Sequence, residues 1–410
     1  MENEDTAPLR SYGNRSINTT WTVSYNAIRA KNEGAANLLL LWAHLDNKIL
    51  PYWILQAGVN RSSALAEDLS EWLKDAADDE VKFLKVVRLL RSYCLVESLH
   101  GSSTHSTHPV VHQWAFHIQK EYHRAELSRL AVLIIGYAVP DEYATEYHQK
   151  QRQLFPHAES WMERMERTTV NTEAEVDEKM LYALHRIGML LSDQGKLEKA
   201  EKMYQRALEG YEKAWGPDHT STLSTVNNLG NLYANQGKLA EAEKMYQRAL
   251  EGKEKAWGPD YTSTLNTVNN LGLLYADQGK LAEAEKMYQR ALYGYEKALG
   301  PHNVASYVPA LNTAYSYGTL FENQGRLSDA KLMYSRALRG YKIVFGTEYR
   351  WYRAAQERLQ HLETCRDSRS ASPMAASRLD QQAIDVSPMT GSAGLTTSKR
   401  LRLLRKLRLR

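Results

Sequence analysis

The second half of the chain repeats one segment at a nearly constant period, and this period restricts the fold more than any other feature of the sequence. GKLEKAEKMYQRALEGYEKAWGPD begins at Gly195, and GKLAEAEKMYQRALEGKEKAWGPD begins at Gly237. GKLAEAEKMYQRALYGYEKALGPH begins at Gly279 and the looser GRLSDAKLMYSRALRGYKIVFG at Gly325, so the spacings are 42, 42 and 46 residues. Such a period is typical of stacked supersecondary units, which bind macromolecules along an extended surface. It therefore favours partner binding over small-molecule catalysis.

Each unit is predicted to be a pair of helices, and the second unit shows why. Gly237 lies between its two apolar stripes, where a left-handed residue costs glycine nothing, and Gly258-Pro259 stops the second helix. One pair alone would leave an apolar face exposed, so stacking on neighbouring units must supply most of the stability. The residues that recur at three- and four-residue spacing are Leu223, Val226, Leu229, Leu232 and Tyr233, then Leu239, Ala242, Met245, Tyr246, Ala249 and Leu250.

This pattern carries a family resemblance. Leu229-Gly230, Tyr233, Gly237 and the small and aromatic residues Ala242, Tyr246 and Ala249 resemble the tetratricopeptide repeat. The 42-residue unit, with its VNNLG and GPD segments, resembles the kinesin light chain subtype over residues 176–345. The resemblance implies a mainly α fold, a right-handed α-solenoid of helix pairs whose first helices line a concave groove.

The resemblance also implies which side chains face that groove, where a protein or peptide ligand would lie. A side-chain amide at such a position can hydrogen-bond an extended peptide backbone, and Asn is otherwise a mediocre helix former. The alternative is that these Asn residues pair with the adjacent repeat or with water. The residues carried over, unit by unit, are His185, Asp193, Ser224, Asn227, Asn231, Asn235, Asn266, Asn269, Asp277, Asn312, Tyr315 and Asn323.

Changes in composition and the positions of turn-forming residues divide the rest of the chain into predicted segments. Short β-capable pieces, 94–96 and 110–111, flank the polar turn GSSTHSTH, and helices followed by such a hairpin are a winged-helix pattern. The Ser-rich segment after 366 cannot bury enough apolar surface to offset its ordering entropy. We expect a polar arm over 1–18, a winged-helix-like domain over 19–124, a degenerate helix pair or linker over 125–175, the repeat array over 176–345, a capping helix over 346–366, and a disordered Ser-rich and basic tail over 367–410.

The first domain has a resemblance of its own. TTWTVSYNAIRAKNEGAANLLLLWAHLDNKILPYWIL, LLRSYCLVES and THPVVHQWA resemble the winged-helix part of NOD-like signalling NTPases, in particular fungal ones with repeat tails. A Met-His-Asp segment in that family places its His against the diphosphate of ADP, and His112 is the matching residue here, between Val111 and Gln113. The sequence holds no GxxxxGK[ST] phosphate loop, so we expect no cofactor, with ADP or ATP bound only if an NTPase core is supplied elsewhere.

Three hypotheses follow. The first is a non-enzymatic interaction scaffold that binds a partner peptide in the groove, as part of a fungal NOD-like defence system. The second is a fragment or subunit of a signalling NTPase in which His112 senses ADP. The third is a cargo adaptor that resembles kinesin light chain, although no sustained heptad pattern precedes residue 176. No nucleic-acid partner is expected, because the first domain lacks a dense basic face, and oligomerisation stays open.

Charge and cysteine content bear on location. The last twelve residues, KRLRLLRKLRLR, hold seven basic side chains, and removing them turns the formal net charge of +4 into −3. This tail has three interpretations: a segment for nuclear import or for binding an acidic surface, an amphipathic helix for anionic membranes, or an unselected extension. Only Cys94 and Cys365 are present, no signal peptide or apolar run of membrane-spanning length is visible, and we expect a cytoplasmic protein.

Overall fold

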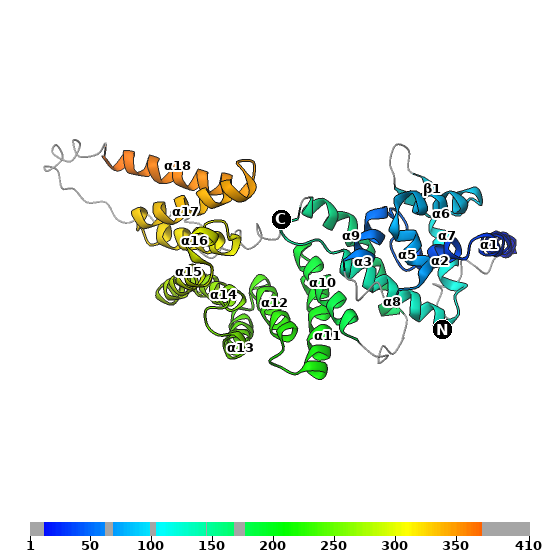
Figure 1. Ribbon diagram of the computed structural model, residues 1–410, viewed down its shortest axis with the longest axis horizontal. Helices are drawn as coiled ribbons and strands as arrows, with labels where there is room; N and C mark the ends of the chain where they lie inside the picture. The colour runs from blue at the N-terminus through cyan, green and yellow to red at the C-terminus, as the bar shows by residue number, and fades with distance from the viewer. Residues whose placement is uncertain (1–11, 62–68, 99–103, 145, 168–176, 371–410) are drawn as a thin grey trace, which may run out of the picture. The chain divides into compact units, whose positions relative to one another are not determined.

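The computed structural model describes residues 12–61, 69–98, 104–144, 146–167 and 177–370, and helices dominate these residues (Figure 1). The chain divides between Ala214 and Trp215 into two compact units. The division falls inside the predicted array, so the first repeat belongs to the first unit.

The first unit holds the helices that precede the array and the first repeat pair. Its core lies around two apolar helices, since Leu38–Trp42 and Leu130–Ile135 are buried. Within it α8 packs against α2, α3, α9 and α10. The elements are α1 (Tyr12–Lys31), α2 (Glu33–Trp42), α3 (Tyr52–Asn60), α5 (Glu71–Asp78), α6 (Glu80–Ser92), β1 (Glu97–Ser98), β2 (His105–Ser106), α7 (Pro109–His117), α8 (Glu121–Ala138), α9 (Tyr147–Arg167), α10 (Glu178–Asp193) and α11 (Leu197–Trp215).

A small hairpin follows the early helices, but its strands are not where the sequence pattern put them. β1 and β2 pair antiparallel through Glu97 with Ser106 and Ser98 with His105, and Leu50 forms one further bridge to His105. The predicted strands at 94–96 and 110–111 are wrong. Cys94 has a φ of 57° just after α6. Residues 110–111 lie in α7, because Pro109 suits a first helical position and the side chain of His108 caps the helix.

Two other expected boundaries need correction. α1 begins at Tyr12, so residues 12–18 of the predicted polar arm are helical, and residues 1–11 lie outside the described part. α18 continues to Ser370, four residues into the segment predicted to be disordered. The prediction for 371–410 lies outside the described residues. The capping role predicted for 346–366 corresponds to α18, which buries Ala355 and Leu362 with residues of α16 and α17.

The second unit is an α-solenoid of consecutive helix pairs. Each first helix packs against the second helix of its pair, and each second helix packs against the helix that follows it. Glycine makes this approach possible: a Cβ on Gly230 would lie 2.7 Å from the Tyr246 ring, and one on Gly252 would lie 2.5 Å from Leu223. The helices are α12 (Thr220–Gln236), α13 (Leu239–Trp257), α14 (Thr262–Asp277), α15 (Leu281–Val304), α16 (Val308–Asn323), α17 (Leu327–Phe345) and α18 (Arg350–Ser370).

Charged contacts repeat from one pair to the next. Glu243 of α13 pairs with Lys280 at 3.4 Å, and Glu285 of α15 pairs with Arg326 at 2.8 Å. In the first unit, Glu159 of α9 pairs with Lys196, the residue equivalent to Lys280, at 3.8 Å, and with Lys199 at 3.0 Å. The helix pair α8–α9 therefore contacts α10–α11 through the same kind of ion pair as one repeat makes with the next. No helix in the described part of the chain is long and apolar enough to cross a bilayer.

Candidate partner-binding surface

Several of the predicted groove amides are used inside their own helix pair. Tyr246 Oη donates to Asn231 Oδ1 at 2.7 Å, and Tyr295 Oη donates to Asn266 Oδ1 at 2.5 Å. In the fourth unit Tyr341 Oη donates to Asn312 Oδ1 at 2.7 Å. Each of these three carbonyl oxygens thus ties a first helix to the second helix of its pair. All three Asn residues are half-buried.

Asn227 joins two neighbouring units. Its Oδ1 accepts a hydrogen bond from Thr267 Oγ1 at 3.0 Å and another from Asn270 Nδ2 at 3.3 Å. Below it, Lys253 Nζ donates to the same Thr267 hydroxyl at 3.0 Å and to Ser263 O at 3.3 Å. Lys253 is only 3% exposed, and this burial lowers its pKa to about 8. For Asn227 the contacts are those of the alternative interpretation, in which the amide pairs with the adjacent repeat.

Asn269 occupies the equivalent position one repeat later, but its carbonyl oxygen does not accept the hydrogen bonds that Asn227 accepts. The residue is 5% exposed, and among the described residues its buried Oδ1 has no hydrogen-bond partner. The next unit explains this, because Thr313 donates instead to Pro309 O at 2.9 Å. Ser316, a shorter side chain, stands where the previous unit has Asn270. A buried acceptor without a partner costs free energy, and a ligand N–H that reached it would remove this cost.

The other candidates of the second unit are less uniform. Tyr315 is 4% exposed, with its ring 5.3 Å from that of Tyr334 and 5.4 Å from that of Trp351, so it packs in the core. Burial also raises the pKa of Tyr315. Asn323 is exposed at the end of α16. The remaining three candidates, Ser224, Asn235 and Asp277, are half-buried.

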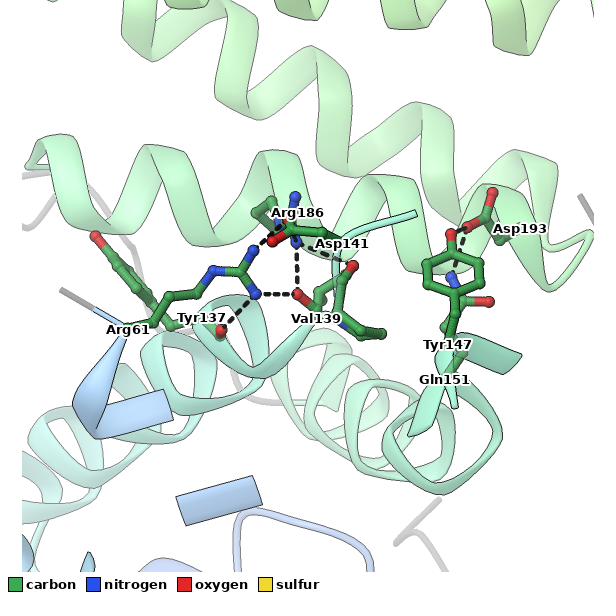
Figure 2. Close-up of polar contacts among 9 residues, drawn as sticks. Arg61, Tyr137, Val139, Asp141, Tyr147, Gln151, Arg186 and Asp193 are labelled. Carbon is green, nitrogen blue, oxygen red and sulfur yellow. Dashed lines mark hydrogen bonds and ion pairs between the residues drawn. The ribbon is translucent and has the colours of Figure 1, made fainter. Parts of the chain in front are cut away.

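In the first unit, α9 covers the end of the predicted groove helix. Tyr147 Oη donates to Asp193 Oδ2, and Gln151 Nε2 donates to the same oxygen at 2.5 Å (Figure 2). Burial raises the pKa of Asp193 to about 6. His185 precedes Asp193 on the same helix, and its ring lies 5.6 Å from that of Tyr204. Burial, and then the charge of the neighbouring Arg186, lower the pKa of His185 to about 4. Asp193 is therefore already occupied by side chains of the chain itself.

A second polar cluster joins α10 to the end of α8 (Figure 2). Arg61 Nη1 donates to Val139 O at 2.6 Å, and Arg186 donates to Val139 O and to Pro140 O at 3.1 Å. Both guanidinium groups also pair with Asp141. Two cations thus meet the carbonyl end of α8, where helical C=O groups lack partners and the helix dipole is negative.

Glycine packing reinforces this junction. A Cβ on Gly136 of α8 would lie 2.4 Å from the Cα of Ala183 on α10, so the two helices touch through backbone. The sequence patterns missed this cluster because Arg61 and Asp141 lie outside the repeats and far in sequence from Arg186, which lies in the first repeat. We define the α8–α10 junction as Arg61, Gly136, Val139, Asp141, Ala183 and Arg186.

His112 is part of the core of the first unit. Its Nε2 lies 3.0 Å from Trp42 O and 3.1 Å from Leu45 O, and carbonyls only accept, so this nitrogen carries the proton. Its Nδ1 accepts from Arg164 Nη2 at 2.9 Å. The residue is 6% exposed, and burial lowers its pKa to about 4. Contact with a diphosphate would require one of these bonds to break.

Comparison with protein families identifies the repeats. Residues 179–255 and residues 264–305 match tetratricopeptide-repeat family models. The chain therefore contains tetratricopeptide repeats, as the sequence pattern predicted, and the family models that match are repeat models rather than catalytic ones. No curated protein matches this sequence.

The solved structures that match the chain share little sequence with it. BtubC (BKLC) from P. vanneervenii is 18% identical, with 61% of this chain and 100% of that chain covered and a TM-score of 0.39. A putative kinesin light chain of Podospora anserina with nearly identical TPR-like repeats is 16% identical, with 47% and 88% covered and a TM-score of 0.40. A signal-transduction ATPase from Pyrococcus horikoshii with a tetratricopeptide repeat sensor is 13% identical, with 85% and 58% covered and a TM-score of 0.29.

Proposed function

We propose that the protein is a non-enzymatic scaffold that binds an extended segment of a partner protein across the first helices of the second unit, with Asn269 as the main polar contact. Tetratricopeptide repeats generally bind protein or peptide partners, and among the candidate Asn side chains the Asn269 carbonyl oxygen is buried with no partner in the described part of the chain. An extended segment supplies backbone N–H donors, and one such donor would satisfy it. The open Oδ1 of Asn269 is the single observation that carries the proposal.

Asn227 and Asn269 form a matched pair for the test. Peptides selected from a random display library against the full chain should bind Asn269→Ala about tenfold more weakly or worse, which corresponds to about 1.4 kcal/mol or more. Asn227→Ala removes a bridge between units, so it should lower the urea midpoint of the second unit and affect binding less. Equal affinity of the selected peptides for Asn269→Ala and for the unaltered chain would overturn the assignment.

A second candidate function is a signalling role in which the first domain responds to the repeats, as in fungal NOD-like proteins. It is supported by the order of helices and hairpin in the first unit and by the α8–α10 junction, which joins the first repeat directly to the preceding helices. In its NTPase form, ADP would bind near His112 with a core from another polypeptide.

Calorimetric titration of ADP tests the NTPase form. Binding should appear only when a P-loop protein co-purifies with the chain, and should strengthen in Arg164→Gln, which removes one of the bonds that must break before His112 contacts a diphosphate. A complex in which Arg164→Gln leaves ADP affinity unchanged would exclude the His112 role. A kinesin-light-chain-like cargo adaptor stays an alternative that depends on the sequence resemblance alone.

A further inference from the structure

The second helices of the third and fourth repeats, α15 and α17, expose large apolar side chains. Tyr293 on α15 is 68% exposed, and on α17 Leu332 is 60% and Ile343 is 69% exposed. The residues equivalent to Leu332, Tyr293 and Ile343 are charged in the earlier repeats. They are Lys244, Glu251 and Lys255 in the second repeat and Lys202, Glu209 and Lys213 in the first repeat. Exposed apolar residues scattered singly are ordinary, but these three replace charged residues of an otherwise repeated surface.

One of the replacements is accompanied by a second change at its ion-pair partner. Lys255 pairs with Asp218 at 2.6 Å, and Lys297 pairs with Asp260 at 2.5 Å. At the next repetition of this contact the lysine position holds Ile343 and the aspartate position holds His302. Both partners of an ion pair are therefore absent together, and neither is left as an unpaired charge.

Helix geometry brings the three side chains to one surface. Leu332, Arg339 and Ile343 are spaced by seven and four residues, which puts them on one face of α17. Tyr293 is the residue of α15 that corresponds to Arg339. The Arg336–Glu296 ion pair, at 2.6 Å, joins the two helices one turn from Leu332 and one turn from Tyr293. We call Tyr293, Leu332 and Ile343 the outer patch.

The charge around the outer patch indicates the chemistry of its partner. Lys286, Arg339 and Lys342 are exposed on the same helices, and none of them has a carboxylate within 4.0 Å among the described residues. The nearby Glu296 is already paired with Arg336. A second copy of this surface would bring like charges together, whereas carboxylates between apolar side chains would complement it.

We propose that the outer patch docks an amphipathic segment of a partner protein in which large apolar side chains alternate with Asp or Glu. This surface belongs to second helices, α15 and α17, and is separate from the Asn residues of the first helices. Apolar residues would cover Tyr293, Leu332 and Ile343, and the carboxylates would pair with Arg339 and Lys342. Binding of this kind weakens with salt, because the ion pairs lie at an exposed rim.

The test restores the residues of the other units. The triple variant Leu332→Lys, Ile343→Lys and His302→Asp recreates the charged surface with its ion pair, while Asn269→Ala is the matched control on the other face. A helical-peptide display library of Leu, Phe, Glu, Asp, Lys and Ala is selected on the full chain, with the triple variant as counter-selection. The proposal expects enriched peptides to be apolar and acidic, to bind the triple variant about tenfold more weakly, and to bind Asn269→Ala as tightly as the unaltered chain.

Four results would overturn the proposal. They are a selection with no peptide enriched over the triple variant, enrichment of basic peptides, and dimerisation of the unaltered chain in sedimentation equilibrium that the triple variant abolishes. The fourth is co-sedimentation with vesicles of phosphatidylserine and phosphatidylcholine that depends on the same residues. Loss of the enriched peptides in Asn269→Ala would instead assign them to the groove surface, so the two proposals fail separately.

Discussion

Lys253 donates from Nζ to Thr267 Oγ1 at 3.0 Å, and this contact buries an ammonium group between two units where the other three units carry a tyrosine. Tyr211, Tyr295 and Tyr341 are the equivalent residues. Both acceptors of Lys253, Ser263 O and Thr267 Oγ1, are neutral, and burial lowers its pKa to about 8. The second repeat thus contains a buried ammonium group, and no carboxylate offsets the cost of removing it from water.

Lys253→Tyr should therefore stabilise the protein, by about 1–3 kcal/mol, because it removes an uncompensated buried charge and restores the residue of the other units. Its hydroxyl would face Ser224, which corresponds to the acceptors Asn266 and Asn312. Urea unfolding at pH 7 followed by circular dichroism measures the change. A lower midpoint in both Lys253→Tyr and the near-isosteric Lys253→Met would show that the ammonium stabilises the junction.

The same lysine predicts a pH dependence. Its pKa is about 8 in the folded state and 10.5 in the unfolded state, so between these values the unfolded chain binds more protons. The free energy of unfolding should consequently rise with pH from about 8 to about 10.5. Lys253→Met removes this contribution, so the difference between the two curves isolates it from other titrating groups. Parallel curves would contradict the low pKa.

Three buried histidines predict the opposite limit, a loss of stability in acid. Burial lowers the pKa values of His44, His112 and His157 to about 4. Their unfolded value is 6.5, so below that pH the unfolded state binds more protons and stability falls until about pH 4. Each histidine contributes up to about 3 kcal/mol to this loss. Hydrogen exchange, corrected for intrinsic rates, should show α2 and α7 losing protection at pH 5 before α14 does.

Tyr147 holds α9 on the first repeat. Tyr147→Phe removes a donor from the buried carboxylate of Asp193 and should cost about 1–3 kcal/mol. Faster hydrogen exchange in α9 than in α8 would locate the effect, and Tyr143→Phe, at a residue that is 45% exposed, is the control. Unchanged exchange in α9 would mean that Gln151 alone holds Asp193.

Gly136 tests the α8–α10 junction. Since a Cβ there would lie 2.4 Å from the Cα of Ala183, Gly136→Ala must separate the two helices, although alanine is the better helix former. We expect a loss of about 2 kcal/mol or more, as for overpacked cores. Glu126→Ala, on the exposed side of the same helix, should change stability by less than about 0.5 kcal/mol. Equal thermal midpoints for the two variants would contradict the close packing.

The period carried most of the information that sequence could give about the fold. Helix pairs of the array were predictable because each unit repeats the same apolar spacing and the same terminal glycines. Local patterns failed where a neighbouring residue decided the outcome. Val110 and Val111 look β-capable, but Pro109 and the His108 cap start a helix there. The polar composition of 1–18 concealed the start of α1 at Tyr12.

The candidate site was less predictable, because equivalent positions differ through their partners. Asn227 and Asn269 stand in the same sequence pattern, yet Thr267 and Asn270 satisfy one, while Thr313 and Ser316 leave the other open. The substitution of Ser316 for Asn was visible in the sequence and could have identified Asn269. Arg61 and Arg186 gave no such signal, since nothing local links an arginine after α3 to one in α10.

The backbone contact between Gly136 and Ala183 has a practical consequence for dissecting the protein. A fragment cut at residue 176, where the repeats begin in sequence, would expose the α10 surface that Gly136 covers, including Ala183 and the buried guanidinium of Arg186. Such a fragment would begin with an α10 surface that no neighbouring helix covers, and we expect it to aggregate. Limited proteolysis that aims to isolate the repeats should therefore keep α8 and α9 in the fragment. We expect this longer fragment to remain soluble under conditions in which the shorter one aggregates.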